Sequence, residues 1–153
     1  MANGIRLHYW RTGGADKTPL VLAHGSSDDG LCWTNLAKEL QDGYDIIMFD
    51  ARGHGLSDPP TASDPQDVQV EDLAGLIKEL KLTKPILMGH SMGSASVAQF
   101  ATKYPDVARA VILEDRAPFR LNALPNPPRQ SGAVHPGGAL PGALDQQLPQ
   151  LSL

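Results

Sequence analysis

The chain has 153 residues, a hydrophobic content of 41% and a formal net charge of −4. This length is enough to bury one hydrophobic core but not two, so we expect one compact domain. The 13 Lys and Arg residues are scattered along a net-acidic chain, which argues against a nucleic-acid partner.

The first residues carry neither the apolar stretch of a signal peptide nor the roughly 18 apolar residues of a membrane span. We therefore expect a cytoplasmic protein without a membrane partner. Cys32 is the single cysteine, which excludes a disulfide within the chain. We expect its side chain to be a small buried apolar group.

Strands and helices alternate from the start of the chain. Residues 5–12 alternate apolar and polar side chains, which predicts a half-buried strand. Residues 19–25 and 44–50 are short apolar runs, typical of strands that are covered on both faces. Apolar positions at helical spacing predict a helix between these two strands, over 31–41.

The same alternation continues in the second part of the chain. Apolar positions over 64–80 predict an amphipathic helix. Residues 85–90 and 109–114 predict two further strands, with a helix from Ser91 to about Tyr104 between them. The order of elements predicts an α/β fold: a mostly parallel sheet of about five strands with helices on both faces.

The composition changes near residue 117. Residues 117–153 contain seven prolines and four glycines but only three charged side chains. Such a composition, without a repeat, is typical of disordered or weakly ordered segments. We therefore expect an α/β core over 1–116 and a weakly ordered Pro/Gly-rich tail over 117–153.

The turn Gly89-His90-Ser91-Met92-Gly93 joins a buried strand to a helix. A turn this sharp holds its central residue in strained backbone geometry. Side chains at Gly89 and Gly93 would collide with the neighbouring strand and helix, which explains both glycines. We expect the Ser91 hydroxyl to stand at the carboxyl edge of the sheet, where open α/β sheets bind ligands.

A serine in such a turn becomes a nucleophile when a base, an orienting carboxylate and N–H donors for an oxyanion surround it. Met92 lies in the first turn of the helix, so its backbone N–H is one candidate oxyanion donor. The loop "AHGSSDDG" follows the earlier strand and passes close to the site at Gly25. The backbone N–H of Ser26 is therefore the second candidate.

Three motifs in order, "AHGSSDDG", "FDARGHGLSD" and "GHSMGS", resemble the α/β-hydrolase fold family in its serine esterase-like branch, over about residues 3–116. The resemblance implies a Ser, acid, His triad in that chain order and no metal or organic cofactor. Ser91 argues against relatives with an aspartate nucleophile, such as dehalogenases and epoxide hydrolases. For the second motif the resemblance implies a mainly structural role, so we expect Asp50, Arg52 and His54 to brace the loops.

The resemblance also implies that the triad acid follows one of the late strands. Asp115 comes directly after the last predicted strand, on the same edge of the sheet as Ser91. Glu114 points to the other face because side chains alternate along a strand. Asp115 is the better candidate, and an ordinary loop carboxylate is the alternative.

The triad histidine of the family follows strands that this chain lacks, so the resemblance covers only the N-terminal part and implies truncation before the last strands. Only His135 follows the serine and the acid in the expected order. An ordinary loop histidine is the alternative for it. We expect His24 and His90 to pack beneath the loops of the site.

Two functions from different classes fit these observations. The first is a serine hydrolase that cleaves small carboxylic esters through an acyl-enzyme at Ser91. The second is a catalytically silent α/β-hydrolase fragment that acts as a binding or oligomerising module. The strand over 109–114 is expected to be an exposed sheet edge, which invites pairing with the tail or with a second copy in a homo-oligomer.

Overall fold

The computed structural model describes residues 1–14 and 16–115. The predicted tail over 117–153, and His135 with it, lies outside the described residues. The described elements are, in chain order, β1 (Tyr9–Arg11), β2 (Thr18–Ala23), the 3-10 helix η1 (Gly30–Trp33), α1 (Thr34–Leu40), β3 (Tyr44–Phe49), α2 (Val68–Glu79), β4 (Ile86–His90), α3 (Met92–Lys103) and β5 (Ala110–Glu114).

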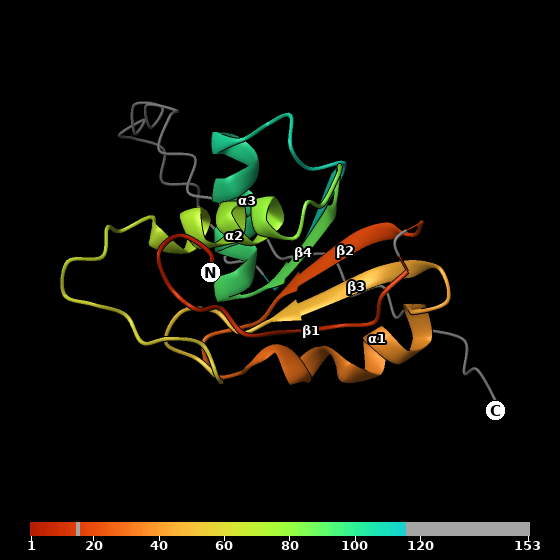
Figure 1. The fold of residues 1–153 in the computed structure, drawn as a ribbon, viewed down its shortest axis with the longest axis horizontal. Coiled ribbons are helices and arrows are strands. Elements are labelled where there is room, and N and C mark those ends of the chain that lie inside the picture. The colour runs from red at the N-terminus through yellow and green to blue at the C-terminus, as the bar shows by residue number, and fades with distance from the viewer. Residues whose placement is uncertain (15, 116–153) are drawn as a thin grey trace, which may run out of the picture. The chain divides into compact units, whose positions relative to one another are not determined.

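The five strands form one sheet in the order β1-β3-β2-β4-β5 (Figure 1). β1 pairs with β3 in the antiparallel sense, and the other neighbouring strands are parallel. Parallel neighbours need crossover connections, and the helices α1, α2 and α3 lie in these connections. The predicted α/β fold with a mostly parallel five-stranded sheet is confirmed.

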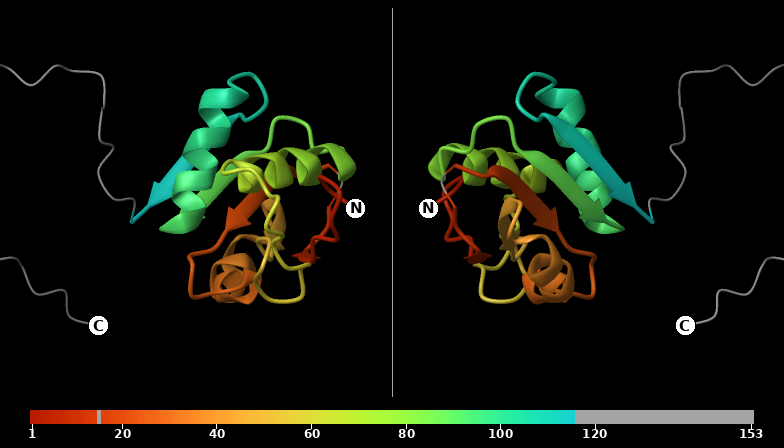
Figure 2. Two further views of the ribbon diagram at one scale, coloured as in Figure 1. Left: turned by 90° about the vertical axis from the view of Figure 1, so that its left-hand side faces the viewer. Right: turned by 90° about the vertical axis from the view of Figure 1, so that its right-hand side faces the viewer.

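Helices cover both faces of this sheet, as Figures 1 and 2 show. Along β2, Val21 and Ala23 point into the core under α2 and α3, whereas Leu20 and Leu22 point into the core under η1 and α1. Side chains of a strand alternate between the faces, so a strand that is covered on both faces must be apolar throughout. This explains the continuous apolar runs in the sequence.

The first strand is shorter than the prediction over residues 5–12. Before β1, the backbone N–H of Arg6 donates to the Asp58 carboxylate at 2.8 Å. The N–H of His8 donates to the Ser57 hydroxyl, also at 2.8 Å. The Asp58 and Ser57 side chains thus accept from backbone N–H groups that a longer β1 would use to pair with its neighbouring strand.

The helix predicted from residue 64 begins only at Val68. The Asp64 carboxylate accepts hydrogen bonds from the Thr61 N–H at 2.9 Å and from its hydroxyl at 2.6 Å. These bonds hold Asp64 in the turn before the helix.

β5 forms one edge of the described sheet. Its Val111 and Ile112 keep 40% and 46% of their surface exposed. They lie on opposite faces, beside Leu87 and Met88 of β4. No helix in the described part of the chain has the length and the apolar composition needed to cross a membrane.

Candidate active site

Ser91 is the residue before α3, at the carboxyl end of β4, and has φ 49° and ψ −109°. A positive φ is uncommon for a residue other than glycine and carries backbone strain. The Ser91 N–H donates to the Glu114 carbonyl of β5 at 3.0 Å, and the Ser91 carbonyl accepts from the Ala95 N–H at 3.2 Å. The sharp turn expected from the sequence is therefore present and is held on both sides.

Gly89 and Gly93 leave no room for side chains. A Cβ at Gly89 would meet the backbone of Gly93 and would lie 2.6 Å from the Ser94 nitrogen. A Cβ at Gly93 would meet the Ala23 carbonyl and would lie 2.8 Å from the His24 oxygen. The Gly93 N–H donates to that His24 oxygen at 3.1 Å, so the first turn of α3 is joined to the end of β2.

The buried Ser94 side chain also holds the serine turn in place. Sequence reasoning did not identify this residue. Its hydroxyl is buried between the Gly89 carbonyl and the Glu114 carbonyl, at 2.7 Å from the latter. One side chain thus links β4, β5 and α3 beneath Ser91. The hint in the sequence is a serine among small residues in the first turn of a helix, where a hydroxyl can bind backbone groups.

The two candidate oxyanion donors lie in the loop after β2 and at the start of α3. Within the described residues, neither the Ser26 N–H nor the Met92 N–H donates a hydrogen bond. The Met92 N–H belongs to the group of helix N-terminal donors that have no partner inside the helix. The loop passes close to His90 at Gly25, where an added Cβ would lie 2.9 Å from His90 Nδ1, so a larger residue there would displace that ring.

His24 orients the loop that carries Ser26. Its ring is buried, its Nε2 accepts from the Ala51 N–H at 3.0 Å, and its Nδ1 donates to the Gly25 carbonyl at 2.7 Å. The C=O and N–H of a trans peptide point in opposite directions. With the Gly25 oxygen bound to His24, the Ser26 N–H of that peptide points away from the core. The expectation that His24 packs beneath the loop is confirmed.

His90 packs against the loop beside Gly25 but is only partly covered by it, so the expectation that it packs beneath the loop is met in part. About 35% of its side chain is exposed, and its Nε2 lies 3.7 Å from Asp115 Oδ2. The Asp115 side chain is 83% exposed. The described residues thus bring Ser91 and Asp115 to the same edge of the sheet, with the His90 imidazole beside the carboxylate.

Comparison with known proteins identifies the family. Residues 18–138 match the model of the alpha/beta hydrolase fold family. The chain belongs to the α/β-hydrolase fold family.

Several hydrolases are similar to this α/β-hydrolase. The 2-(acetamidomethylene)succinate hydrolase of Mesorhizobium japonicum is 38% identical over 102 residues, which are 66% of this chain and 37% of that protein. The serine hydrolase BPHL of Homo sapiens is 34% identical over 118 residues, which are 72% of this chain and 40% of that protein. The chain spans less than half the length of these relatives.

Solved structures show the same partial match. A thermophilic esterase from Thermogutta terrifontis has a TM-score of 0.68 and 34% identity, with 74% of this chain and 41% of that chain covered. An epoxide hydrolase from Bacillus megaterium has a TM-score of 0.71 and 28% identity, with 76% and 41% covered. The α/β-hydrolase described here therefore corresponds to part of the fold of these enzymes.

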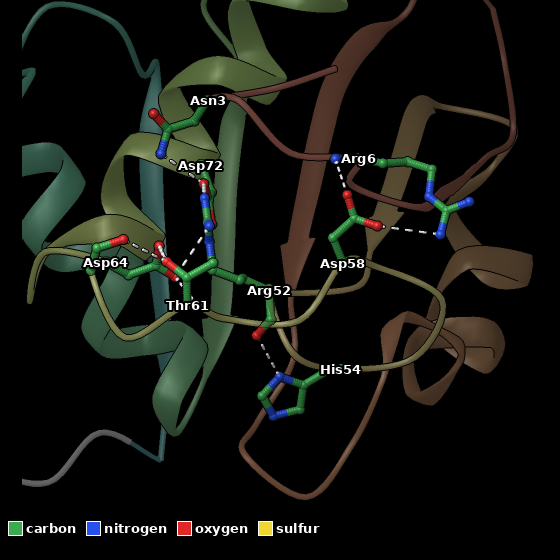
Figure 3. Close-up of polar contacts among 9 residues, drawn as sticks. Asn3, Arg6, Arg52, His54, Asp58, Thr61, Asp64 and Asp72 are labelled. Atoms are coloured by element: carbon green, nitrogen blue, oxygen red, sulfur yellow. Dashed lines mark hydrogen bonds and ion pairs between the residues drawn. The ribbon is translucent and has the colours of Figure 1, made fainter.

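The loops around the site are braced by the second motif of the α/β-hydrolase, as expected. The Asp50 carboxylate is buried and accepts from the Gly30 N–H at 2.8 Å and the Leu56 N–H at 2.9 Å. It also lies 3.1 Å from Nδ1 of His8. Arg52 binds the buried Asp72, as Figure 3 shows.

Cys32 is exposed, so the expectation of a buried apolar side chain was wrong. Gly30 and Trp33, three residues apart in η1, are the buried members of that 3-10 helix. Residues three apart share one face of a 3-10 helix, so Cys32 falls on another. Partial burial of the thiol and the nearby charges of Asp28, Asp29 and Glu114 raise the pKa of Cys32 to about 11.

The backbone strain at Ser91 can be measured as a difference in the free energy of unfolding between a glycine and an alanine variant. We expect Ser91→Gly to be more stable than Ser91→Ala by about 1 kcal/mol, because glycine adopts a positive φ without steric cost. At Ser96, inside α3, the order should reverse, and glycine should be less stable than alanine by about 1 kcal/mol. Urea unfolding of the four variants measures both differences, and the same sign at both positions would contradict strain at Ser91.

Proposed function

We propose that this α/β-hydrolase is a serine hydrolase that cleaves small carboxylic esters through an acyl-enzyme at Ser91. The observation that carries the proposal is the strained turn at Ser91, at the sheet edge where the loop of Ser26 and the start of α3 meet. Two backbone N–H groups without acceptors in the described part of the chain, those of Ser26 and Met92, belong to these two segments. A nucleophile with preorganised donors for an oxyanion is the arrangement that acyl transfer requires.

In the proposed reaction, Ser91 Oγ attacks the acyl carbon while its proton passes to His135. The carbonyl electron pair moves to the oxygen, and this oxyanion accepts hydrogen bonds from Ser26 and Met92. When the oxyanion collapses, the C–O bond to the alcohol breaks, and the alcohol takes the proton from His135. Water then attacks the acyl-enzyme with proton transfer to His135, and the acid leaves as Ser91 regains its proton.

Asp115 orients His135 in this proposal. The contact with His90 involves Oδ2 of Asp115, and the carboxylate is largely exposed, so Oδ1 can accept from a second imidazole. The names of two relatives support hydrolysis, one as a serine hydrolase and one as an esterase. A serine at position 91 is consistent with both.

Covalent labelling of the full chain tests the proposal. Wild-type protein should react with a fluorophosphonate probe and hydrolyse p-nitrophenyl butyrate, and Ser91→Ala should lose the label and the Ser91-dependent hydrolysis. Ser63→Ala, in an exposed turn, is the matched control and should behave like wild type. Equal labelling of wild type and Ser91→Ala would overturn the proposal.

His135 requires its own comparison. Loss of one triad member leaves catalysis about 10³ to 10⁴ above water, which comes from the oxyanion hole and binding. Weak residual hydrolysis therefore does not identify the base. Full hydrolysis by His135→Ala, together with none by Ser91→Ala, would reject His135 as the base and keep Ser91 as the nucleophile.

A second function is favoured by the exposed apolar residues of β5. We propose as the alternative that the chain is a silent module that binds a partner or a second copy through the edge formed by 109–114. Val111 and Ile112 would become buried in such an interface. The hydrolysis measurement separates the two functions, because a silent module would not distinguish wild type from Ser91→Ala.

A further inference from the structure

The two edges of the described sheet differ in how they are protected. At one edge, β1 has three residues, and loop side chains bind the backbone N–H groups of Arg6 and His8 just before it. At the other edge, β5 has five residues and carries neither a charge nor a proline from Ala110 to Leu113 (Figure 2). Short strands, charges and prolines are features that keep sheet edges from pairing with another chain. β1 therefore has a protected edge, and β5 does not.

The backbone of β5 presents donors and acceptors to the open side of the sheet. The Arg109 N–H donates to the Pro85 carbonyl at 2.9 Å, so it points toward β4. Successive residues of a strand direct their N–H and C=O groups to opposite sides, which turns those of Ala110 and Ile112 away from β4. No strand in the described part of the chain pairs with these outward groups.

Apolar side chains reach this edge on the face of the sheet that carries α1. Ile112 lies beside Met88 of β4, and both Met88 and Ile86 are only partly buried at the rim of the core under α1. The side chains of Ile86, Met88 and Ile112 thus form an apolar strip that continues to the open edge. A second apolar strand at that edge would remove part of this strip from water, which is favourable.

The charges at the two ends of β5 complement each other. Arg109 precedes the strand, Glu114 is its last residue, Asp115 follows, and all three are exposed. In an antiparallel pair, the start of one strand lies beside the end of the other. Two copies of β5 in this arrangement bring Arg109 of each copy beside the acidic end of the other, whereas a parallel pair would place like charges together. The sequence of the edge therefore favours a second copy as its partner.

We propose that the β5 strands of two copies pair in the antiparallel sense about a two-fold axis at Ile112 and form one continuous sheet across a homodimer. Such an axis brings the same surface of both copies together. With the axis at the middle residue of β5, Ile112 lies opposite Ile112, Val111 opposite Leu113, and Ala110 opposite Glu114. Every residue of β5 is then paired, and the two Ile112 residues exchange both backbone hydrogen bonds. The inference rests on the second function proposed above, because it names the partner of that edge.

The same register pairs the charges next to the strand. Arg109 lies opposite Asp115 of the second copy, and the two-fold axis repeats this pair at the other end of the interface. Asp115 is also the acid that we propose for the triad. Each candidate site would therefore have a cation from the other copy beside its carboxylate.

Cysteine cross-linking of the full chain tests the register. In a Cys32→Ser background, Ile112→Cys should form a disulfide between two copies, because hydrogen-bonded opposite residues have Cα atoms about 5.5 Å apart. Val111→Cys is the matched control, since two cysteines at 111 would be diagonal neighbours about 7–8 Å apart, beyond the usual span of a disulfide. Absence of cross-links in Ile112→Cys, or equal cross-linking of the two variants, would overturn the inference.

Sedimentation velocity over a series of protein concentrations measures the dimer directly. Wild type should pass from monomer to dimer as the concentration rises. Ile112→Lys places a charge on the edge and should stay monomeric. Ile112→Pro removes an N–H that points away from β4, so it should keep the fold by circular dichroism and also stay monomeric. Leu56→Lys, at an exposed side chain in the turn after β3, is the control and should dimerise like wild type.

Two sedimentation results contradict the proposed interface. A wild type that stays monomeric at all concentrations would exclude a second copy as the partner. A dimer that persists in both Ile112 variants would place the interface elsewhere on the chain.

Charge reversal tests the antiparallel sense. Arg109→Glu and Asp115→Arg should each weaken the dimer about tenfold, because each variant places like charges opposite each other at both ends of the interface. A mixture of the two variants should dimerise more strongly than either alone, since both contacts of the mixed dimer join opposite charges. A mixture that dimerises no better than the separate variants would contradict the antiparallel pairing.

The dimer and the proposed functions fail in different ways. Hydrolysis that depends on Ser91 in a dimeric wild type would reject the silent module and keep the dimer. A monomeric wild type would overturn the dimer, and the comparison with Ser91→Ala would still decide whether Ser91 is the nucleophile.

Discussion

Gly93→Ala should lower the free energy of unfolding by about 3 kcal/mol or more, at the upper end of the cost of overpacking. The added Cβ would meet the Ala23 carbonyl and lie 2.8 Å from the His24 oxygen. Both are backbone atoms at the end of a central strand, so no side-chain rotation relieves the clash. Denaturation in urea, followed by far-ultraviolet circular dichroism, measures the loss.

Gly43→Ala is the matched control for this change. A Cβ at Gly43 would have the Leu40 oxygen at 3.9 Å as its nearest neighbour, which is ordinary van der Waals contact. We expect its free energy of unfolding to stay within about 0.5 kcal/mol of wild type. Similar losses for the two variants would show that the close approach at Gly93 is not the cause.

Arg52→Met should cost about 3–5 kcal/mol, because it leaves a buried carboxylate without its charged partner. Arg52 Nε donates to Asp72 Oδ2 at 2.8 Å, and a second nitrogen donates to Oδ1 at 2.7 Å. Both side chains are almost fully buried. After the substitution, Asn3 Nδ2, at 2.8 Å, is the side-chain donor that still reaches Asp72.

A double variant distinguishes two causes of the loss in Arg52→Met: the lost attraction between Arg52 and Asp72, and the buried charge that Asp72 keeps without a partner. Arg52→Met with Asp72→Leu removes both charges, and we expect it to recover most of the stability that Arg52→Met loses. The exposed pair of Arg6 and Asp58, 3.3 Å apart, is the control, and Arg6→Met should cost less than about 1 kcal/mol. Urea unfolding of wild type, Arg52→Met, Asp72→Leu and the double variant completes the cycle, and a double variant as unstable as Arg52→Met would contradict the explanation.

The fold and the serine turn were predictable because their causes are local. Apolar runs over β2 and β3 indicate strands covered on both faces, and the structure buries them on both faces. The clash at Gly89 is local, because it is with Gly93 and Ser94, whereas the clash at Gly93 is with Ala23 and His24 at the end of β2. The oxyanion donors Ser26 and Met92 were chosen by the same local reasoning and stay predictions.

The resemblance implied that Asp50, Arg52 and His54 brace the loops, but their partners were out of reach of sequence reasoning because the contacts join distant residues. Ser26 and His54 are 28 positions apart, and Arg52 and Asp72 are 20 apart. The periodicity of apolar residues in the sequence does not predict such contacts. Only the packing of the loops brings the two residues of each pair together. The partial exposure of His90 was missed for a related reason, since His90 is the last residue of β4, directly before Ser91 and the start of α3.

The spacing of the two glycines divides the serine turn into closed and open positions. At 89 and 93 the backbone of neighbouring elements fills the space, so a library that varies these sites would return mostly unfolded clones. At 90 and 92 the side chains of His90 and Met92 are only partly covered, and both positions directly flank Ser91. If Ser91 is the nucleophile, as proposed, directed evolution of a new acyl preference has its accessible starting points at these two sites, each one residue away from Ser91.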